Sequence, residues 1–174
     1  MQPKKHRAKI LGGDLETDND GAQAWIVQSC ISDGERRWHD TDVQGIRRTL
    51  TKLMWNYGDI IIYYHNLKYD LSFLKPVIAI FQDADCEVRA TIRRRAPISI
   101  RITMDKTHSV TFRDSMKKLP SDLRQVGRII GLPKLESPRG SFEPGWSKDL
   151  DLTEGSDDWT YIDRDADIVA VAML

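Results

Sequence analysis

The sequence predicts an α/β fold, in which α-helices flank a mixed β-sheet. Residues 59–64 form a short, nearly continuous apolar run, which suits a strand buried on both faces. Apolar residues fall at helical spacing before this run, at 43–54, and after it, at 69–81. Several β-type segments follow between residues 86 and 113. An order of β-β-β-α-β-α, then further strands and closing helices, describes one mixed sheet covered by helices.

Length and composition indicate a single globular domain, 1–174, with no internal repeat, low-complexity tract or convincing boundary. No apolar run approaches the length of a membrane span. The basic residues 1–7 are not followed by an apolar signal core, so we expect no membrane partner and a cytoplasmic location. Cys30 and Cys86 are too few for a disulfide framework and lack metal-ligand spacing, so both thiols should be reduced. The formal net charge of zero neither indicates nor excludes nucleic-acid binding.

The first strand is expected at residues 8–11, and it ends in Gly12-Gly13-Asp14-Leu15-Glu16-Thr17. Asp14 and Glu16 lie two residues apart, so in an extended chain both carboxylates project from one face. Two like charges this close resist ionising together. A pair of divalent cations would relieve the conflict, and hard oxygen ligands suit Mg²⁺ or Mn²⁺. The alternative is a solvated strand end that binds no metal.

A turn and a hairpin are expected next. Residues 18–21 are rich in turn formers, and residues 23–31 read as a strand. Asp33-Gly34 is a hairpin signal, so residues 35–39 should form the returning strand.

Two helices then alternate with the apolar strand. Thr41 is the expected N-cap of a helix that ends near Gly58. The strand at 59–64 should lie beside the first strand of the chain. A second helix is expected at 69–81, with an interruption at Pro76.

The remainder of the chain is expected to supply strands, a loop and two helices. Three β segments are predicted at 87–95, 98–104 and 109–113. A helix lies between Pro120 and Gly131, and the proline- and glycine-rich segment 132–157 should be a loop. Residues 159–174 predict the closing helix.

Two further segments bring acids that can join the first pair. Asp70 falls at the start of a helix, where the helix dipole favours a carboxylate, although ordinary first-turn acids are common. Tyr161 and Asp165 are four residues apart and therefore share one helix face, although a structural tyrosine is the commoner case. Together the acids Asp14, Glu16, Asp70 and Asp165 form the ligand set that a two-metal phosphodiesterase needs. Tyr161 could hydrogen-bond the attacking water.

Three segments resemble the Exo I, Exo II and Exo III motifs of a known family. They are Asp14-Leu15-Glu16-Thr17, Tyr64-His65-Asn66-Leu67-Lys68-Tyr69-Asp70 and Tyr161-Ile162-Asp163-Arg164-Asp165. The family is the 3′–5′ proofreading exonuclease domain of family B DNA polymerases, a DEDDy exonuclease of ribonuclease-H-like fold. The second motif is especially similar to the protein-primed branch. So is Arg113-Asp114-Ser115-Met116-Lys117-Lys118-Leu119-Pro120, which resembles a segment of that branch that contacts single-stranded DNA.

The resemblance implies a role for each matching residue. The two ions, Mg²⁺ or Mn²⁺, would be held by Asp14, Glu16, Asp70 and Asp165. Tyr161 would orient the nucleophilic water. The unpaired 3′ end of a primer would be held by Thr17, His65, Asn66, Tyr69, Ser115 and Met116. The aromatic face of Tyr69 would stack on a base without regard to its identity.

The sequence departs from the family pattern in three places. The family has an assisting lysine before Exo III, for which Lys134 is our choice and Arg139 and Lys148 are rivals. Met116 replaces the usual leucine. The polymerase motifs are not present as a set, so the chain is expected to be an excised domain. Its partners would then be a polymerase module of the same chain, C-terminal to it, and a terminal priming protein.

Two other functions fit the same motifs. One is a DEDDy-type exoribonuclease, which a comparison of DNA and RNA substrates would separate from the first, because only RNA carries the 2′-hydroxyl. The other is a catalytically silent module that docks the priming protein or the template strand. The basic run Arg93-Arg94-Arg95 is compatible with phosphate contacts and equally with a charged edge strand that prevents aggregation.

Overall fold

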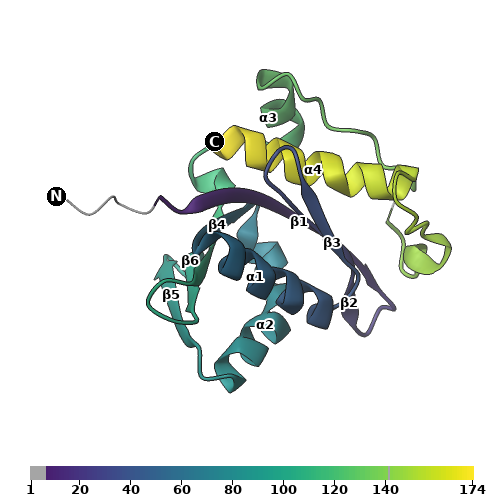
Figure 1. Cartoon of the computed structure of the whole chain (residues 1–174). Coiled ribbons are helices and arrows are strands. Elements are labelled where there is room, and N and C mark those ends of the chain that lie inside the picture. The colour runs from purple at the N-terminus through teal and green to yellow at the C-terminus, as the bar shows by residue number, and fades with distance from the viewer. Residues whose placement is uncertain (1–6, 141) are drawn as a thin grey trace.

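The structure is a computed structural model that describes residues 7–140 and 142–174 (Figure 1). In these residues seven strands form one sheet, in the order β3-β2-β1-β4-β7-β6-β5. The strands are β1 (Lys9–Asn19), β2 (Ala24–Ser32), β3 (Arg37–Asp40), β4 (Asp59–Tyr64), β5 (Glu87–Arg93), β6 (Ala96–Thr103) and β7 (Ser109–Asp114). The helices are α1 (Val43–Tyr57), α2 (Leu67–Asp83), α3 (Leu123–Ile129) and α4 (Asp157–Met173), with 3₁₀ turns η1 (Ser115–Lys117) and η2 (Trp146–Asp149).

The sheet is mixed, as the sequence predicts. Strand β4 pairs in parallel with β1 on one side and with β7 on the other, and the remaining pairs are antiparallel. Helices α1 and α2 cover one face of the sheet, and α4 with α3 covers the other (Figure 1). The predicted α/β class, a mixed sheet flanked by helices, is therefore confirmed. None of the described helices is both long and apolar enough to cross a membrane.

Alternation along β1 sends its side chains to two different layers. Leu11 and Leu15 join the main core under α1 and α2. Gly12 and Asp14 occupy the alternate positions, which face α4. A methyl group at Gly12 would overlap the backbone of Ala166 and Ala170, so glycine here allows α4 to lie directly against β1.

The predicted end of the first strand is wrong, and the turn predicted at residues 18–21 begins two residues later, at Asp20. Strand β1 stays paired with β2 as far as Asn19, with a bulge between Glu16 and Thr17. Its parallel pairing with β4 reaches only Gly13. Asp14 therefore lies inside a strand, at the point where that strand loses one of its two neighbours.

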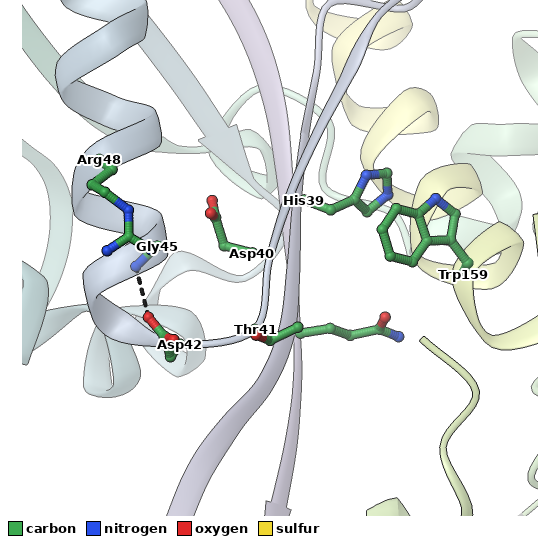
Figure 2. A pocket seen from close by; sticks show the side chains of 8 residues that line it. His39, Asp40, Thr41, Asp42, Gly45, Arg48 and Trp159 are labelled. Carbon is green, nitrogen blue, oxygen red and sulfur yellow. Dashed lines mark hydrogen bonds between the residues drawn. The ribbon is translucent and has the colours of Figure 1, made fainter. Parts of the chain in front are cut away.

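Two helix predictions also need correction. The N-cap of α1 is Asp42 and not Thr41, because the Asp42 carboxylate accepts a hydrogen bond of 2.7 Å from the Gly45 amide (Figure 2). Helix α2 continues without interruption through Pro76. That proline is on the exposed side of the helix, while Leu74 and Val77 anchor the opposite side in the core.

The strand predicted at 87–95 ends earlier, at Arg93. Arg94 and Arg95 form the turn between β5 and β6, with φ of 49° and 63°. A two-residue reversal in a twisted hairpin favours such left-handed backbone, and this accounts for the shorter strand.

Candidate metal centre

Three carboxylates meet between the middle of β1 and the middle of α4. Asp14 and Glu16 project from the α4 face of β1, and Asp165 projects from α4 toward them. One carboxylate oxygen from each of the three lies within 4.8 Å of the other two. The direct contact between β1 and α4 that Gly12 permits is what brings Asp165 into this group.

The environment of the cluster disfavours three separate negative charges. Burial raises the pKa of Asp14 well above its ordinary value, and the charges of Asp165 and Glu16 raise it further. Burial, followed by the charge of Asp165, raises the pKa of Glu16 to about 8. The Oδ1 atom of Asp165 is buried and has no hydrogen-bond partner among the described residues. A divalent cation would neutralise this charge and occupy the unpartnered oxygen, so the residues present fit such an ion.

Asp70 lies beside the cluster but is not one of the three carboxylates whose oxygens lie within 4.8 Å of one another. It lies in the first turn of α2 and is buried. Burial raises its pKa to about 7, with a further contribution from Asp114. Its charge also raises the pKa of Asp14 and of Glu16. The structure thus brings three of the four predicted acids into one group and places the fourth at its edge.

Lys134 is the predicted assisting residue that reaches the cluster. Its ammonium forms an ion pair with Asp165, and it donates a hydrogen bond of 3.2 Å to the Tyr161 hydroxyl. Its Nζ also lies 4.6 Å from the centre of the Tyr161 ring. The rival Arg139 instead pairs with Asp158, and Lys148 lies on η2 beside Gly145.

The segment that carries Lys134 has no regular secondary structure, yet both helices of its layer hold it. The Leu132 amide donates a hydrogen bond of 2.8 Å to the carbonyl of Gly127 on α3. The Arg164 guanidinium, on α4, donates a hydrogen bond of 2.7 Å to the carbonyl of Pro133. These two bonds fix the backbone immediately before Lys134, and therefore the reach of its side chain.

The predicted DNA contacts form two hydrogen-bonded pairs near the cluster. The hydroxyls of Thr17 and Tyr69 lie 2.7 Å apart, which links β1 to the first turn of α2. The Nδ1 atom of His65 lies 2.9 Å from the Ser115 hydroxyl. Tyr69 and Met116 present apolar surface to solvent, with 52% and 37% of their area exposed.

Asp114 is a structural member of this region that sequence reasoning missed. Its carboxylate accepts hydrogen bonds from the Asn66 amide at 3.3 Å and from the Met116 amide at 3.0 Å. It therefore ties the start of α2, where Asn66 has left-handed backbone with φ of 74°, to the η1 turn. The signal was present as an aspartate directly before a short turn, which is a common capping pattern.

The basic run 93–95 lies at the tip of the β5–β6 hairpin. Arg93 and Arg94 line a surface hollow together with Lys117 of η1. The structure thus brings part of the basic run next to η1, the turn that also carries Met116.

The fold that surrounds this site is of the ribonuclease-H-like α/β type, as predicted. It is shared with solved structures of Phi29 DNA polymerase. The complex of that polymerase with primer-template DNA matches 96% of this chain at a TM-score of 0.74 and 17% sequence identity. The complex with single-stranded DNA matches 96% of this chain at a TM-score of 0.72 and 17% identity. The chain spans 31% of the length of each of these polymerase chains. No family model and no curated protein matches it at the level of sequence.

Proposed function

We propose that this chain is a metal-dependent 3′–5′ exonuclease domain of a DNA polymerase of the protein-primed type. Its substrate would be the 3′ end of single-stranded or frayed DNA, from which it releases 5′-mononucleotides. The observation that carries the proposal is the convergence of Asp14, Glu16 and Asp165 with Tyr161 and Lys134 at one place in this fold. Three motifs far apart in the sequence supply these groups, and the fold likeness to a DNA polymerase supports the same function.

In this proposal Asp14, Glu16, Asp70 and Asp165 hold two Mg²⁺ or Mn²⁺ ions. Such ions lower the pKa of a bound water and stabilise the leaving oxygen of a phosphodiester. The Tyr161 hydroxyl is available to orient the nucleophilic water, because its own hydrogen-bond partner, Lys134, is a donor and leaves the hydroxyl proton free. Lys134 also offsets the negative charge around Asp165 and fixes the position of the phenol.

The terminal nucleotide would lie between the two hydrogen-bonded pairs. On one side Thr17 and Tyr69 offer hydroxyls and an exposed ring, and on the other His65 and Ser115 lie beside the exposed Met116. Asn66 stands between them at the start of α2. Stacking on an aromatic ring is sequence-tolerant, which suits an enzyme that must accept every terminal base.

We further propose that the domain works beside a polymerase module of the same chain and, at initiation, a terminal priming protein. The fold likeness covers about a third of the polymerase chains that it matches. The module would deliver a frayed primer end to the exposed side chains of Tyr69 and Met116.

The test is degradation of a 3′-labelled single-stranded DNA oligonucleotide in Mn²⁺. Asp14→Ala and Asp165→Ala should each abolish the activity, because each removes a ligand from the cluster. Asp157→Ala is the matched control, since Asp157 is an exposed acid on the first turn of the same helix α4 and should leave the rate unchanged. If the two cluster variants degrade DNA as fast as the wild type, the site assignment is wrong.

Two further outcomes separate the alternatives. Faster degradation of a matched RNA oligonucleotide would indicate an exoribonuclease. A chain that binds no Mn²⁺ in a calorimetric titration would indicate a catalytically silent module.

A further inference from the structure

A second group of metal-binding side chains lies one strand away from the acidic cluster. Cys30 on β2, His39 on β3 and Asp163 on α4 each place one donor atom within 4.8 Å of the other two. Cys30 and His39 face each other across the β2–β3 pair. The Cys30 sulfur is 3.5 Å from Oδ1 of Asp163, and His39 Nε2 contacts the same carboxylate. Sulfur, nitrogen and oxygen donors thus converge on one point.

The three side chains are held in place before any ion arrives. Cys30 is fully buried, and its neighbours in the core are Ile162 and Ala166 of α4. The His39 ring stacks on Trp159, with ring centres 3.8 Å apart (Figure 2). Figure 2 shows His39 directed toward Trp159 of α4, while the next residue, Asp40, is directed toward α1. The stacking fixes the orientation of the imidazole toward Asp163.

We propose that Cys30, His39 and Asp163 form a Zn²⁺ site with water as its fourth ligand. Zinc prefers thiolate, imidazole and carboxylate donors in a tetrahedral arrangement, whereas Mg²⁺ and Mn²⁺ prefer the all-oxygen cluster at Asp14. Binding replaces the proton of the Cys30 thiol with the metal, and that proton leaves to solvent.

The charges around the group are balanced by a zinc ion. The Arg37 guanidinium forms an ion pair of 2.6 Å with the Asp167 carboxylate. Its Nε atom also lies 3.8 Å from a carboxylate oxygen of Asp163. With zinc bound, the Cys30 thiolate and the two carboxylates carry as much negative charge as zinc and Arg37 carry positive charge. Arg37 and Asp167 then act as an outer pair that holds Asp163 in place, as metal sites commonly require.

A cavity borders the group at His39, while Cys30 and Asp163 lie behind its lining. It has a volume of about 180 Å³, and His39, Trp159 and Gln28 are among the residues that line it. The Gln28 side chain is almost fully buried, and its Oε1 has no hydrogen-bond partner among the described residues. Gln28 lies two residues before Cys30 and so on the same face of β2, and in the proposed site its oxygen would serve as an acceptor for the zinc-bound water.

Zinc at this position would fasten the β2–β3 hairpin to α4, the helix that carries Asp165. Its effect would therefore be on the position and stability of α4. The sequence conceals the site, because one ligand lies more than a hundred residues from the other two.

Co²⁺ is the probe for the experiment, because a thiolate ligand gives it a sulfur-to-cobalt charge-transfer band that oxygen ligands do not. One equivalent of Co²⁺ added to the purified reduced chain should produce this band, and Zn²⁺ should displace it. Cys30→Ser should lose the band. Cys86→Ser is the matched control and should keep it, since Cys86 lies outside the group. Asp14→Asn should also keep it, which separates this site from the acidic cluster.

His39→Gln and Asp163→Asn test the other two ligands by Zn²⁺ affinity. Each should weaken Zn²⁺ binding at least ~10-fold, the lower end of the loss found even for outer partners of metal sites. In the Asp14→Asn background, which weakens the acidic cluster, Zn²⁺ should raise the melting temperature of the chain and of its Cys86→Ser variant, but not that of its Cys30→Ser variant. If Cys30→Ser does not fold, His39→Gln decides the question. The proposal is overturned if the wild type shows no band, if the band survives in Cys30→Ser, or if His39→Gln binds Zn²⁺ as tightly as the wild type.

Discussion

At the scale of single residues, the proposed role of Lys134 follows from its contacts with two candidate catalytic groups. It bridges Tyr161 and Asp165, whereas its rival Lys148 lies on η2. We predict that Lys134→Ala lowers kcat on single-stranded DNA by about 10²-fold, the smaller end of the effect of a positioned acid–base group. KM should change little, because Lys134 contacts the candidate catalytic groups and not the predicted DNA side chains.

Lys148→Ala is the control for this prediction. It removes the same charge and the same side-chain length from the η2 turn, so kcat should stay close to that of the wild type. Steady-state kinetics on one oligonucleotide decide between the two lysines. Equal losses in both variants would show that net positive charge matters and the contact with Tyr161 does not.

Tyr69 provides a second prediction at this scale, concerning binding. Its exposed ring can stack on a base, and its hydroxyl is 2.7 Å from that of Thr17. Tyr69→Ala should weaken binding of single-stranded DNA by about 1–3 kcal/mol, the value of one base stacked on an aromatic side chain. Tyr69→Phe keeps the ring and should retain most of the affinity. Equilibrium titrations in Ca²⁺ measure binding separately from cleavage, and equal affinities for Tyr69→Ala and the wild type would exclude stacking.

At the scale of secondary-structure elements, the contact between β1 and α4 determines the metal centre. Gly12→Ala would place a methyl group against the backbone of Ala166 and Ala170. Because backbone cannot move aside as a side chain does, α4 must shift, at a cost of about 1–3 kcal/mol for overpacking. The shift moves Asp165 away from Asp14, so we predict a loss of activity greater than the loss of stability alone explains.

Urea unfolding and exonuclease rates, measured well below the unfolding transition, separate the two effects of Gly12→Ala. Val171→Ala is the control, because Val171 is an exposed residue of α4 whose side chain lies near Gly34 of the β2–β3 turn and not against Gly12. A folded Gly12→Ala variant with wild-type activity would contradict the proposed dependence of the site on this contact.

The sequence predicts the elements better than their boundaries. The run at 59–64 and the closing helix are found as predicted, because strong hydrophobic patterns need no tertiary information. The end of β1 was missed because its pairing with β2 continues where its pairing with β4 stops, and this depends on neighbours distant in sequence. The N-cap was misplaced by one residue, since Thr41 and Asp42 are both capping residues and backbone geometry selects between them.

The same reasoning applies to the site. Spacing could predict that Asp14 and Glu16 share one face, and that Tyr161 and Asp165 share another. It could not predict that Asp70 stands at the edge of the closest group, nor which of three basic residues reaches Asp165. The position of Asp70 depends on where α2 begins, and the reach of Lys134 depends on a loop whose backbone hydrogen-bonds to α3 and α4.

At the scale of the whole molecule, the metal-free acidic cluster makes stability depend on pH. The pKa of Glu16 rises from 4.5 to about 8 on folding, and that of Asp70 from 3.8 to about 7, in both cases mainly through burial. The folded state therefore binds more protons than the unfolded state between these limits. The free energy of unfolding must then fall as pH rises through this window. The stability that these two protonated carboxyl groups contribute is fully lost above about pH 8.

We predict that, in the presence of a chelator, the melting temperature falls from about pH 5 to about pH 8. Carboxylates with lowered pKa, such as Asp105, are ionised in both states across this window and do not oppose the trend. Glu16→Gln should flatten the profile, because the amide cannot ionise. Mg²⁺ or Mn²⁺ should raise the melting temperature most at the alkaline end, where the ligands are deprotonated, since an ion that binds only the folded state stabilises it by mass action. A melting temperature that rises with pH in the metal-free wild type would show that burial does not keep these carboxyl groups protonated in the folded state.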